Sequence, residues 1–249
     1  PALADQLKVI NGLLLLITLF LPAMLFSYLA YPKPMAYLGL SLPGKRWFLI
    51  LGPVLMLIAL PFTSLLEEWS RLIPAIGQSK QLDEQYNRLA EAMLQSGQLR
   101  DLLMNIAFMS LLPAIIEEVF FRGCLQQLLC SWMRRTPIIA IVLVAIIFSA
   151  FHGQLSGFIP RLYLGLILGL AYYYSGSLWV TVLMHFMNNF VTVLFTYFYH
   201  THITDIDPSD MPDTNLWLGL ASGLAVIGVL VLFYRNRRVL MLIEVDNEE

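Results

Sequence analysis

Seven long apolar segments constrain the fold of this chain more than any other feature of its sequence. A helix needs about 20 predominantly apolar residues to cross the hydrocarbon core of a bilayer. Because hydrocarbon offers no hydrogen-bond partners, segments of this length are expected to be helices that bond their own backbone. The sequence therefore predicts an all-α, polytopic membrane helical bundle with about seven transmembrane helices. The segments span residues 9–31, 47–66, 103–131, 137–152, 158–176, 178–200 and 215–234.

Composition supports this fold class. The chain is 58% hydrophobic and 13% charged, which is too apolar for a soluble globular domain to cover with polar surface. Its net charge of −2 provides no basic surface for nucleic acid, so the expected surroundings are a lipid bilayer without nucleic acid. We expect a single membrane domain over residues 1–249, and its compact length favours a bacterial inner (cell) membrane. The first segment shows no cleavable signal pattern and is expected to remain as an anchor.

Positively charged residues predict an orientation. All three basic clusters fall on one side of the bilayer if the N-terminus lies on the other, and the positive-inside rule makes that side cytoplasmic. The acidic loop before the last segment contains no Lys or Arg and falls on the opposite side. The charge pattern is therefore consistent with seven segments. The clusters are Lys33, Lys45 and Arg46, then Arg134 and Arg135, and finally Arg235, Arg237 and Arg238.

One polar stretch, residues 67–101, interrupts the apolar pattern. Leu82, Tyr86, Leu89 and Met93 recur in it at helical spacing, which predicts an amphipathic helix. Such a helix could lie on the membrane surface, or it could be a solvated connector with one apolar face. A substrate gate is a third interpretation that the sequence leaves open.

Three ionisable residues lie within the third apolar segment. Each costs roughly 2.5–3.5 kcal/mol at the centre of a membrane helix on insertion scales, so each needs a partner or a purpose. Glu118 and Arg122 are four positions apart and can form a charge-assisted pair on one helix face. Glu117 is rotated by about 100° from Glu118 and has no such local partner. Glu118 and Arg122 are therefore predicted to support the structure, while Glu117 faces a polar cavity; a purely structural network of all three is the alternative.

Two histidines and an asparagine occur in later apolar segments. His152 ends the fourth segment, while His185 and Asn189 are four positions apart in the sixth and point the same way. A single histidine in an apolar helix is usually a packing residue. Two of them together with an unpaired glutamate can satisfy one another and assemble a hydrolytic site. Glu117, His152 and His185 are thus the candidate catalytic residues, and Asn189 shares the helix face of His185.

The remaining sequence patterns give less information about function. The chain contains neither an HExxH zinc helix nor a GxSxG serine elbow, which excludes two familiar hydrolase architectures. The remaining polar groups are interpreted as helix-end charges (Glu67, Glu68, Arg71), as an exposed loop that could also bind a metal (His200, His202, Asp205) and as core or lipid-facing thiols (Cys124, Cys130).

The three motifs together resemble a known family. They read Glu117-Glu118 to Arg122 (EExxxR), Phe148 to His152 (FxxxH) and His185 to Asn189 (HxxxN), in this order on successive apolar segments. This set resembles the CAAX-protease and bacteriocin-processing family of intramembrane proteases, also called the Abi family. The resemblance covers residues 103–195, the expected catalytic core, and leaves the first two segments, residues 67–101 and the last segment outside.

The resemblance implies an intramembrane endopeptidase that hydrolyses a peptide bond in a membrane-associated or lipidated peptide or protein. It implies that Glu117 and His152 activate water, and that His185 and Asn189 stabilise the oxyanion. A metal-dependent version makes Glu117, His152 and His185 ligands of Zn²⁺. A prenylated CAAX terminus, a bacteriocin leader and a signalling peptide all fit as substrates. The rival functions are a non-catalytic immunity or scaffold protein and a proton-coupled transporter that uses Glu117 and the histidines as a relay.

The expected topology leaves one difficulty. Counted from the basic side, His152 falls near the far end of its segment, whereas His185 lies about 8 residues, roughly 12 Å, from the near end of its own. Straight helices of equal depth would separate the two histidines. Their convergence requires helices that tilt or start at different depths, or segment boundaries that differ by several residues.

Overall fold

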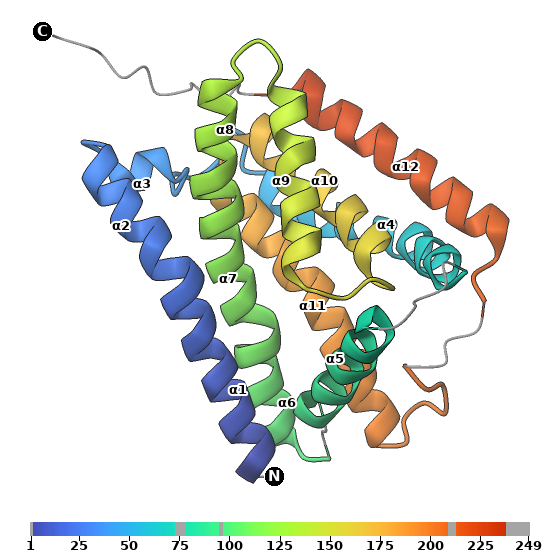
Figure 1. Cartoon of the computed structure of the whole chain (residues 1–249). Helices are drawn as coiled ribbons and strands as arrows, with labels where there is room; N and C mark the ends of the chain where they lie inside the picture. The colour runs from blue at the N-terminus through green and yellow to red at the C-terminus, as the bar shows by residue number, and fades with distance from the viewer. Residues whose placement is uncertain (1, 73–77, 95–96, 209–212, 238–249) are drawn as a thin grey trace, which may run out of the picture.

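The computed structural model describes residues 2–72, 78–94, 97–208 and 213–237, which form helices joined by short connections (Figure 1). Three π-helical segments, Leu16–Phe20, Ile106–Leu111 and Val119–Gln126, join α1 to α2, α6 to α7 and α7 to α8. The helices are α1 (Ala2–Leu15), α2 (Leu21–Ala30), α3 (Pro34–Tyr37), α4 (Phe48–Arg71), α5 (Gln78–Leu94), α6 (Leu99–Asn105), α7 (Leu112–Glu118), α8 (Gln127–Trp132), α9 (Pro137–Phe151), α10 (Phe158–Ser175), α11 (Leu178–His200) and α12 (Leu216–Arg235).

Among the described residues, five helices are long and apolar enough to cross a membrane. The all-α membrane fold is confirmed, but the predicted count of seven spans is not. The other two expected segments also form helices: α9 has only 15 residues, and α10 carries Arg161 and three consecutive tyrosines that lower its hydropathy. The five candidate spans are Leu3–Ala30, Phe48–Arg71, Leu99–Trp132, Leu178–His200 and Leu216–Arg235.

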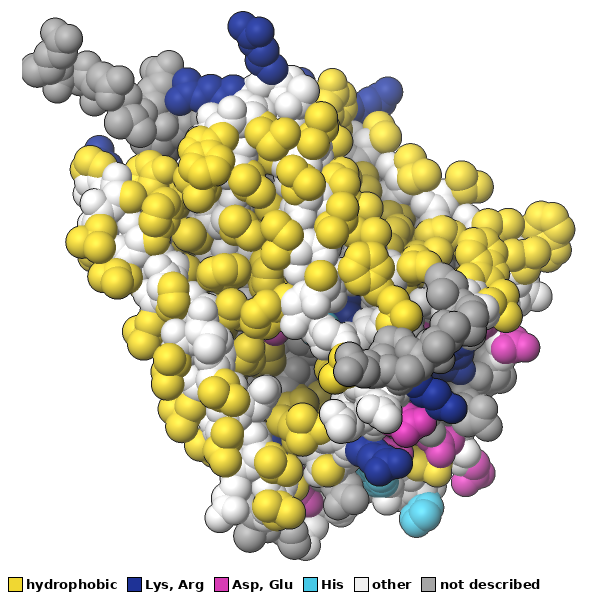
Figure 2. All heavy atoms as spheres, viewed as in Figure 1, with side chains coloured by type: hydrophobic (Ala, Val, Ile, Leu, Met, Phe, Trp, Pro, Cys, Tyr) yellow, Lys and Arg dark blue, Asp and Glu magenta, His cyan; other side chains and the backbone are white. Residues whose placement is uncertain are grey.

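Charged groups separate between the two ends of the bundle. The ends of α2 and α12 and the connection from α8 to α9 lie at the top of Figure 1, and the N-terminus lies at the bottom. Lys45 Nζ donates to Asn236 Oδ1 over 2.6 Å, which joins the connection after α3 to the end of α12. Acidic side chains gather toward the opposite end, over α5 and the chain after α11 (Figure 2). This arrangement agrees with the expected grouping of the basic clusters; Arg238 lies outside the described residues.

Small residues allow two helix pairs to approach closely, as their spacing predicted. Gly165 and Gly169 face α9, where a Cβ on Gly169 would lie 2.7 Å from Ile141 Cγ2. Gly219 and Gly223 face α4, where a Cβ on Gly219 would lie 2.8 Å from a leucine methyl group. Each of these pairs, α10 with α9 and α12 with α4, is packed along its length.

The first turn of α11 starts against a buried loop. The backbone N–H of Leu178 donates to the carbonyl of Gly39 over 2.8 Å. Gly39 has φ +73°, and a Cβ there would lie 2.6 Å from Tyr172 Oη. Only glycine combines this backbone conformation with so close an approach. The chain after α3 therefore folds into the bundle and fixes where α11 begins.

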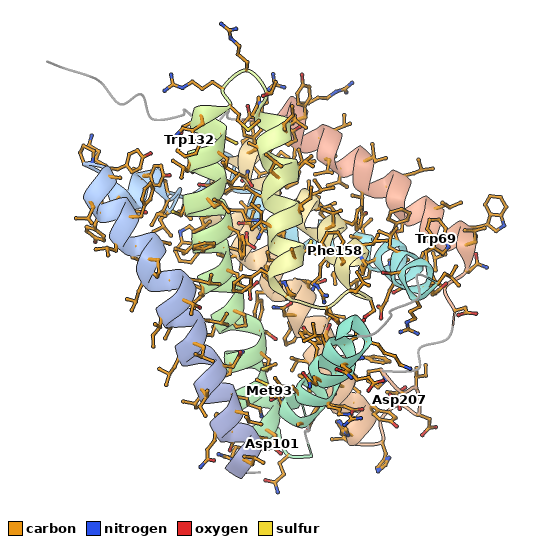
Figure 3. All side chains as sticks on the ribbon, viewed as in Figure 1. Trp69, Met93, Asp101, Trp132, Phe158 and Asp207 are labelled. Carbon is orange, nitrogen blue, oxygen red and sulfur yellow. The ribbon has the colours of Figure 1, made fainter. Side chains whose placement is uncertain are left out.

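The polar stretch contains the expected amphipathic helix, α5, which contacts α1 and α11. Met93 is buried close to the junction with α6, where Figure 3 labels it. Leu82, Tyr86 and Leu89, the rest of the predicted apolar stripe, are exposed. Near the start of α5 the buried side chain is Asp83 instead. The apolar spacing thus predicted the helix but not the face by which it packs.

Candidate active site

The acidic pair lies in the middle of the longest continuous helix. Glu117 and Glu118 end α7, and the π-helical segment Val119–Gln126 follows directly. A π-helical turn shifts the side chains after it relative to a regular α-helix and is frequent at functional sites. Both glutamates are buried, with 7% of Glu117 and 0% of Glu118 exposed. Two adjacent buried carboxylates need separate partners.

Glu118 has the predicted partner. Arg122 Nη1 donates to Glu118 Oε1 over 2.8 Å, and neither side chain is exposed. Arg122 Nη2 also donates to the carbonyl of Gly165 over 3.3 Å, and its guanidinium lies 4.5 Å from the ring centroid of Phe148. This ion pair therefore connects the acidic helix to α9 and α10.

His185 adds a contact that sequence spacing does not reveal. Its Nδ1 lies 2.9 Å from the same Glu118 Oε1. The carboxylate can only accept, so Nδ1 carries the proton and donates, which leaves Nε2 at the opposite edge of the ring. Glu118 thus orients His185 in addition to pairing with Arg122. The residues are 67 positions apart, and no local pattern indicates their contact.

His152 is fixed by the end of its own helix. Its Nδ1 lies 2.9 Å from the carbonyl of Phe148, one turn earlier, and therefore donates to it. Gly153 follows with φ +67°, the left-handed conformation that commonly ends a helix. Nε2 of His152 is again the free ring nitrogen. A carboxylate thus orients one histidine and a helix end orients the other. In both cases Nε2 is the ring nitrogen that this bond leaves unused.

Both Nε2 atoms meet at Glu117. Its Oε2 lies 4.0 Å from Nε2 of His152 and 4.0 Å from Nε2 of His185. This distance is too long for a direct hydrogen bond between the carboxylate and an imidazole. An oxygen atom of a small molecule lying between the two groups can contact both of them. Oε2 of Glu117 is buried and has no hydrogen-bond partner among the described residues. The arrangement can hold and polarise a small polar group between an acid and two imidazoles.

The structure explains how His152 and His185 come to lie at the same depth in the bundle. α9 is only about 22 Å long because it has 15 residues, so His152 lies short of the far side. α9 ends well above the lower end of the long helix in Figure 1, and Phe158 marks the start of α10 beside it in Figure 3. α11 begins against the buried loop at Gly39. The histidines meet because these two helices start and end at different depths.

Asn189 is less closely associated with the other candidates. It lies one turn after His185 in α11 and is half-buried, and its Oδ1 accepts from Asn188 Nδ2 over 3.3 Å. Among the contacts of the described residues, none joins Asn189 to Glu117 or to either histidine. Asn189 lies on the same helix face as His185, as predicted. Its role in catalysis stays a prediction.

The side chains match zinc in type but not in spacing. Two neutral imidazoles and a carboxylate are a common catalytic zinc set. Ligands about 2.0–2.1 Å from a tetrahedral ion lie roughly 3.3 Å apart, whereas both N–O separations here are 4.0 Å. Within the part of the chain described, no group of three or more His, Cys, Asp or Glu side chains is arranged to hold a metal ion. At these separations the residues do not match tetrahedral zinc geometry, and the zinc-dependent alternative stays a prediction.

The weaker candidates stay apart from the site. Glu67 pairs with Arg71 over 3.0 Å on the exposed end of α4, and Glu68 accepts a hydrogen bond from the backbone of Thr214. His200 and His202 are exposed. Both cysteines are buried free thiols.

Two residues near the site were not identified as candidates from the sequence, although the sequence contains an indication of each. Asp83 accepts hydrogen bonds from the backbone N–H groups of Leu155 and Ser156, at 2.8 and 3.1 Å, and so holds the loop that follows His152. Its signal is an acid on the buried side of an amphipathic helix. Arg161 lies in the first turn of α10, and its signal is a lone cation at the start of an apolar segment.

These features define a class: an α-helical integral membrane protein with a buried glutamate and two histidines brought together from three helices. Comparison with protein families then matches residues 99–191 to the Rce1-like family, described as type II CAAX prenyl endopeptidase. The match contains all three motifs and confirms the resemblance that they carry. No curated protein and no solved structure matches the chain.

Proposed function

We propose that this protein is an intramembrane endopeptidase that cleaves a membrane-associated or lipidated peptide, with Glu117 as the residue that activates water. The observation that supports this most is the position of Glu117 Oε2, buried and 4.0 Å from Nε2 of both histidines. A buried carboxylate oxygen without a hydrogen-bond partner is costly, and a reaction that uses it as a base gives a reason for that cost.

In the proposed reaction, one water molecule lies between Glu117 and His152. The carboxylate accepts a proton from the water molecule. At the same time the oxygen of the water attacks the scissile carbonyl carbon. Glu117 then transfers this proton to the leaving amide nitrogen as the peptide bond breaks. His152, whose Nδ1 donates to a backbone carbonyl, uses its free Nε2 to orient the water.

His185 has the other role, because its environment differs. When its Nε2 is protonated, the adjacent Glu118 carboxylate compensates the positive charge through the 2.9 Å contact at Nδ1. Nε2–H can then donate to the carbonyl oxygen as negative charge develops there. Asn189, one turn further along the same face, is proposed as a second donor. The neighbouring carboxylates thus have separate tasks: Glu117 moves a proton, and Glu118 orients a donor.

The test uses the purified full chain in non-ionic detergent micelles with a prenylated peptide that ends in a Cys-aliphatic-aliphatic-X sequence. Cleavage is followed by mass spectrometry. Glu117→Gln is expected to lower kcat by about 10²–10⁴-fold without loss of folded protein. Glu67→Gln, an exposed acid on α4, is the matched control and should cleave normally. Full activity of the Glu117 variant would overturn the assignment.

Two further measurements address the rival functions. Proton-coupled flux in proteoliposomes without cleavage of prenylated, leader or signalling peptides would favour a transporter. Loss of cleavage on chelation, with recovery on adding Zn²⁺, would replace the glutamate–histidine reaction by a zinc-dependent one. The proposed reaction instead predicts activity that persists through a chelator titration.

A further inference from the structure

The helices around the site fill the two halves of the bundle unequally. α9 begins after the basic connection from α8 and ends directly before His152, and α10 packs against it in the opposite direction, back toward the basic end. Between the site and that end the packing is close. Gln126 Nε2 donates to the carbonyl of Gly169 over 2.9 Å, and Tyr172 is fully buried. The basic half of the bundle is therefore closed by its own side chains.

In the acidic half, neither α9 nor α10 continues. The long helix, Leu99–Trp132, and α11 extend past His152 toward the acidic end. α5 crosses this region in Figure 1 and is attached to the loop after His152 by the hydrogen bonds of Asp83. In Figure 2, Lys or Arg and His atoms show through an indentation of the apolar surface beside the lower end of α9. The site is therefore less covered on the side of the acidic end.

Two polar side chains are buried in this half of the long helix. Ser110 is 0% and Asn105 is 1% exposed, and neither Ser110 Oγ nor Asn105 Oδ1 has a hydrogen-bond partner among the described residues. Leaving such a group unpaired costs about 1–3 kcal/mol, whereas a buried water molecule can satisfy it. Both residues lie between Glu117 and the acidic end of the helix. They are suited to water that moves toward Glu117.

Ser110 lies on the side of its helix that faces α11. Phe108 and Leu112 face α1, where a Cβ on Gly12 would lie 3.5 Å from Phe108 and 2.8 Å from Leu112. Ser110 is two positions from each of them, so its side chain projects from the opposite side of the helix. The segment Ile106–Leu111 packs against α11. Ser110 therefore lies between the two helices that carry the glutamate and one of the histidines.

The corresponding face of α11 is also polar, and its exposure increases away from the site. Asn189 and Thr192 follow His185 by four and seven positions, so the three side chains share one face of the helix. His185 is buried, Asn189 is half-buried and Thr192 is exposed. The face that carries His185 thus opens toward the acidic end, although α11 is an apolar candidate span. Because polar groups are costly in hydrocarbon, this face suits water and a peptide backbone better than lipid.

We propose that water and the peptide substrate reach Glu117 from the acidic end of the bundle. They follow a polar path formed by Asn105, Ser110, Asn189 and Thr192. The basic clusters lie at the opposite end, which the positive-inside rule places in the cytoplasm, so the substrate is presented on the non-cytoplasmic side. This proposal deepens the proposed function and rests on it for the identity of the substrate as a peptide. It favours a leader or signalling peptide that has left the cytoplasm over a prenylated terminus on the cytoplasmic face.

The test measures access to the path from each side of the membrane. The full chain carries Ser110→Cys, with Cys124→Ala and Cys130→Ala to remove its two buried thiols, and is produced in a bacterial inner membrane. Right-side-out and inside-out vesicles are treated with a membrane-impermeant methanethiosulfonate, and modification is followed by mass spectrometry. The reagent needs a hydrated thiolate, so Ser110→Cys is expected to react about tenfold or more faster in right-side-out vesicles.

Three further variants in the same background calibrate the result. Ser27→Cys replaces an equally buried serine of α2, whose hydroxyl donates to a carbonyl of its own helix, and it should react from neither side. Arg135→Cys, on the exposed connection from α8 to α9, should react only in inside-out vesicles. Thr192→Cys, at the exposed part of the path, should react from the same side as Ser110→Cys.

The outcomes separate this proposal from the proposed function. Reaction of Ser110→Cys from the side of Arg135→Cys, or from neither side, would overturn the polar path. If the two variants exchanged sides, the non-cytoplasmic presentation would be refuted. None of these results depends on cleavage, so a chain that is modified as expected but cleaves no peptide would support the path and refute the proposed function.

A cleavage assay then asks whether the substrate uses the path. Complete modification of Ser110→Cys should lower cleavage by about tenfold or more, because the added group occupies the space between the two helices. Modified Arg135→Cys should keep its activity. Cleavage that continues unchanged after modification of Ser110→Cys would show that the substrate reaches Glu117 by another route.

Discussion

The two halves of the site are built from adjacent glutamates but differ in how their polar groups are satisfied. In one half, a single oxygen of Glu118 contacts both Arg122 and His185, and the guanidinium also bonds to α10. In the other, Oε2 of Glu117 lies 4.0 Å from two histidine nitrogens and is hydrogen-bonded to neither. Among the described residues Oε2 of Glu117 has no partner, as is also true of Oε2 of Glu118, so the halves differ in the bonds that their other atoms make. The first half is a bonded network that joins helices. The second is a set of groups held near one another without bonds between them.

The difference indicates how one helix supports both structure and chemistry. A buried charge is stable when its partner is fixed beside it, as in the Glu118 half. A reacting group needs the opposite, because bonds to the protein would compete with bonds to the substrate. The loop held by Asp83 and Arg161 lies beside the Glu117 half, through His152. Substitutions in the two halves should therefore separate effects on stability from effects on activity.

Arg122→Leu should have the largest effect on stability. It removes the partner of a fully buried carboxylate, and breaking such a pair costs about 3–5 kcal/mol. Thermal or denaturant unfolding in detergent measures this loss. Arg88→Leu on exposed α5 should change stability little. If both variants unfolded alike, the Glu118 half would not have the structural role assigned to it.

Asp83→Ala should have a smaller and more local effect. The substitution removes two hydrogen bonds from backbone N–H groups to a charged acceptor, each worth about 1.5–3 kcal/mol at most. Amide hydrogen exchange should accelerate at Leu155 and Ser156, while the core of α7 stays protected. Glu84→Ala, an exposed neighbour on the same helix, is the control. Unchanged exchange in the loop would show that α5 does not hold it.

Gly153→Ala should cost about 1–2 kcal/mol, because its φ of +67° is unfavourable for a residue with a Cβ. Apart from its chain neighbours, no atom of the described residues lies within 4 Å of the added Cβ, so the effect is in the backbone. Gly228→Ala in α12 meets equally open space and should instead stabilise its helix by roughly 0.5–1 kcal/mol. The proposed reaction also predicts lower kcat for Gly153→Ala, because His152 shifts with the helix end.

Sequence reasoning predicted the local features of this molecule better than the distant ones. The Glu118–Arg122 pair and the close-packing glycines follow from helical spacing alone. The contact of His185 with Glu118 links distant helices, and no spacing rule reaches across 67 positions. Relative depth was also beyond the sequence: hydropathy predicted a segment at 137–152, close to the observed α9, but does not show at what depth each helix starts. On α5 the apolar spacing indicated one face, but Asp83 is buried on another, where it accepts hydrogen bonds from the backbone of a distant loop.

Glu117→Gln is the most direct test of the difference between the two halves of the site, although its expected effect on stability is the smallest. Glutamine has nearly the same shape but no charge, so the substitution removes a buried charge whose Oε2 has no hydrogen-bond partner in the described chain. The free energy of unfolding should therefore change by less than about 1 kcal/mol, with a gain as the expected sign, even though activity is lost. Unfolding of this variant beside Arg122→Leu provides the measurement. A loss comparable to that of Arg122→Leu would mean that Glu117 also belongs to the bonded network, and the division of the site into two halves would then fail.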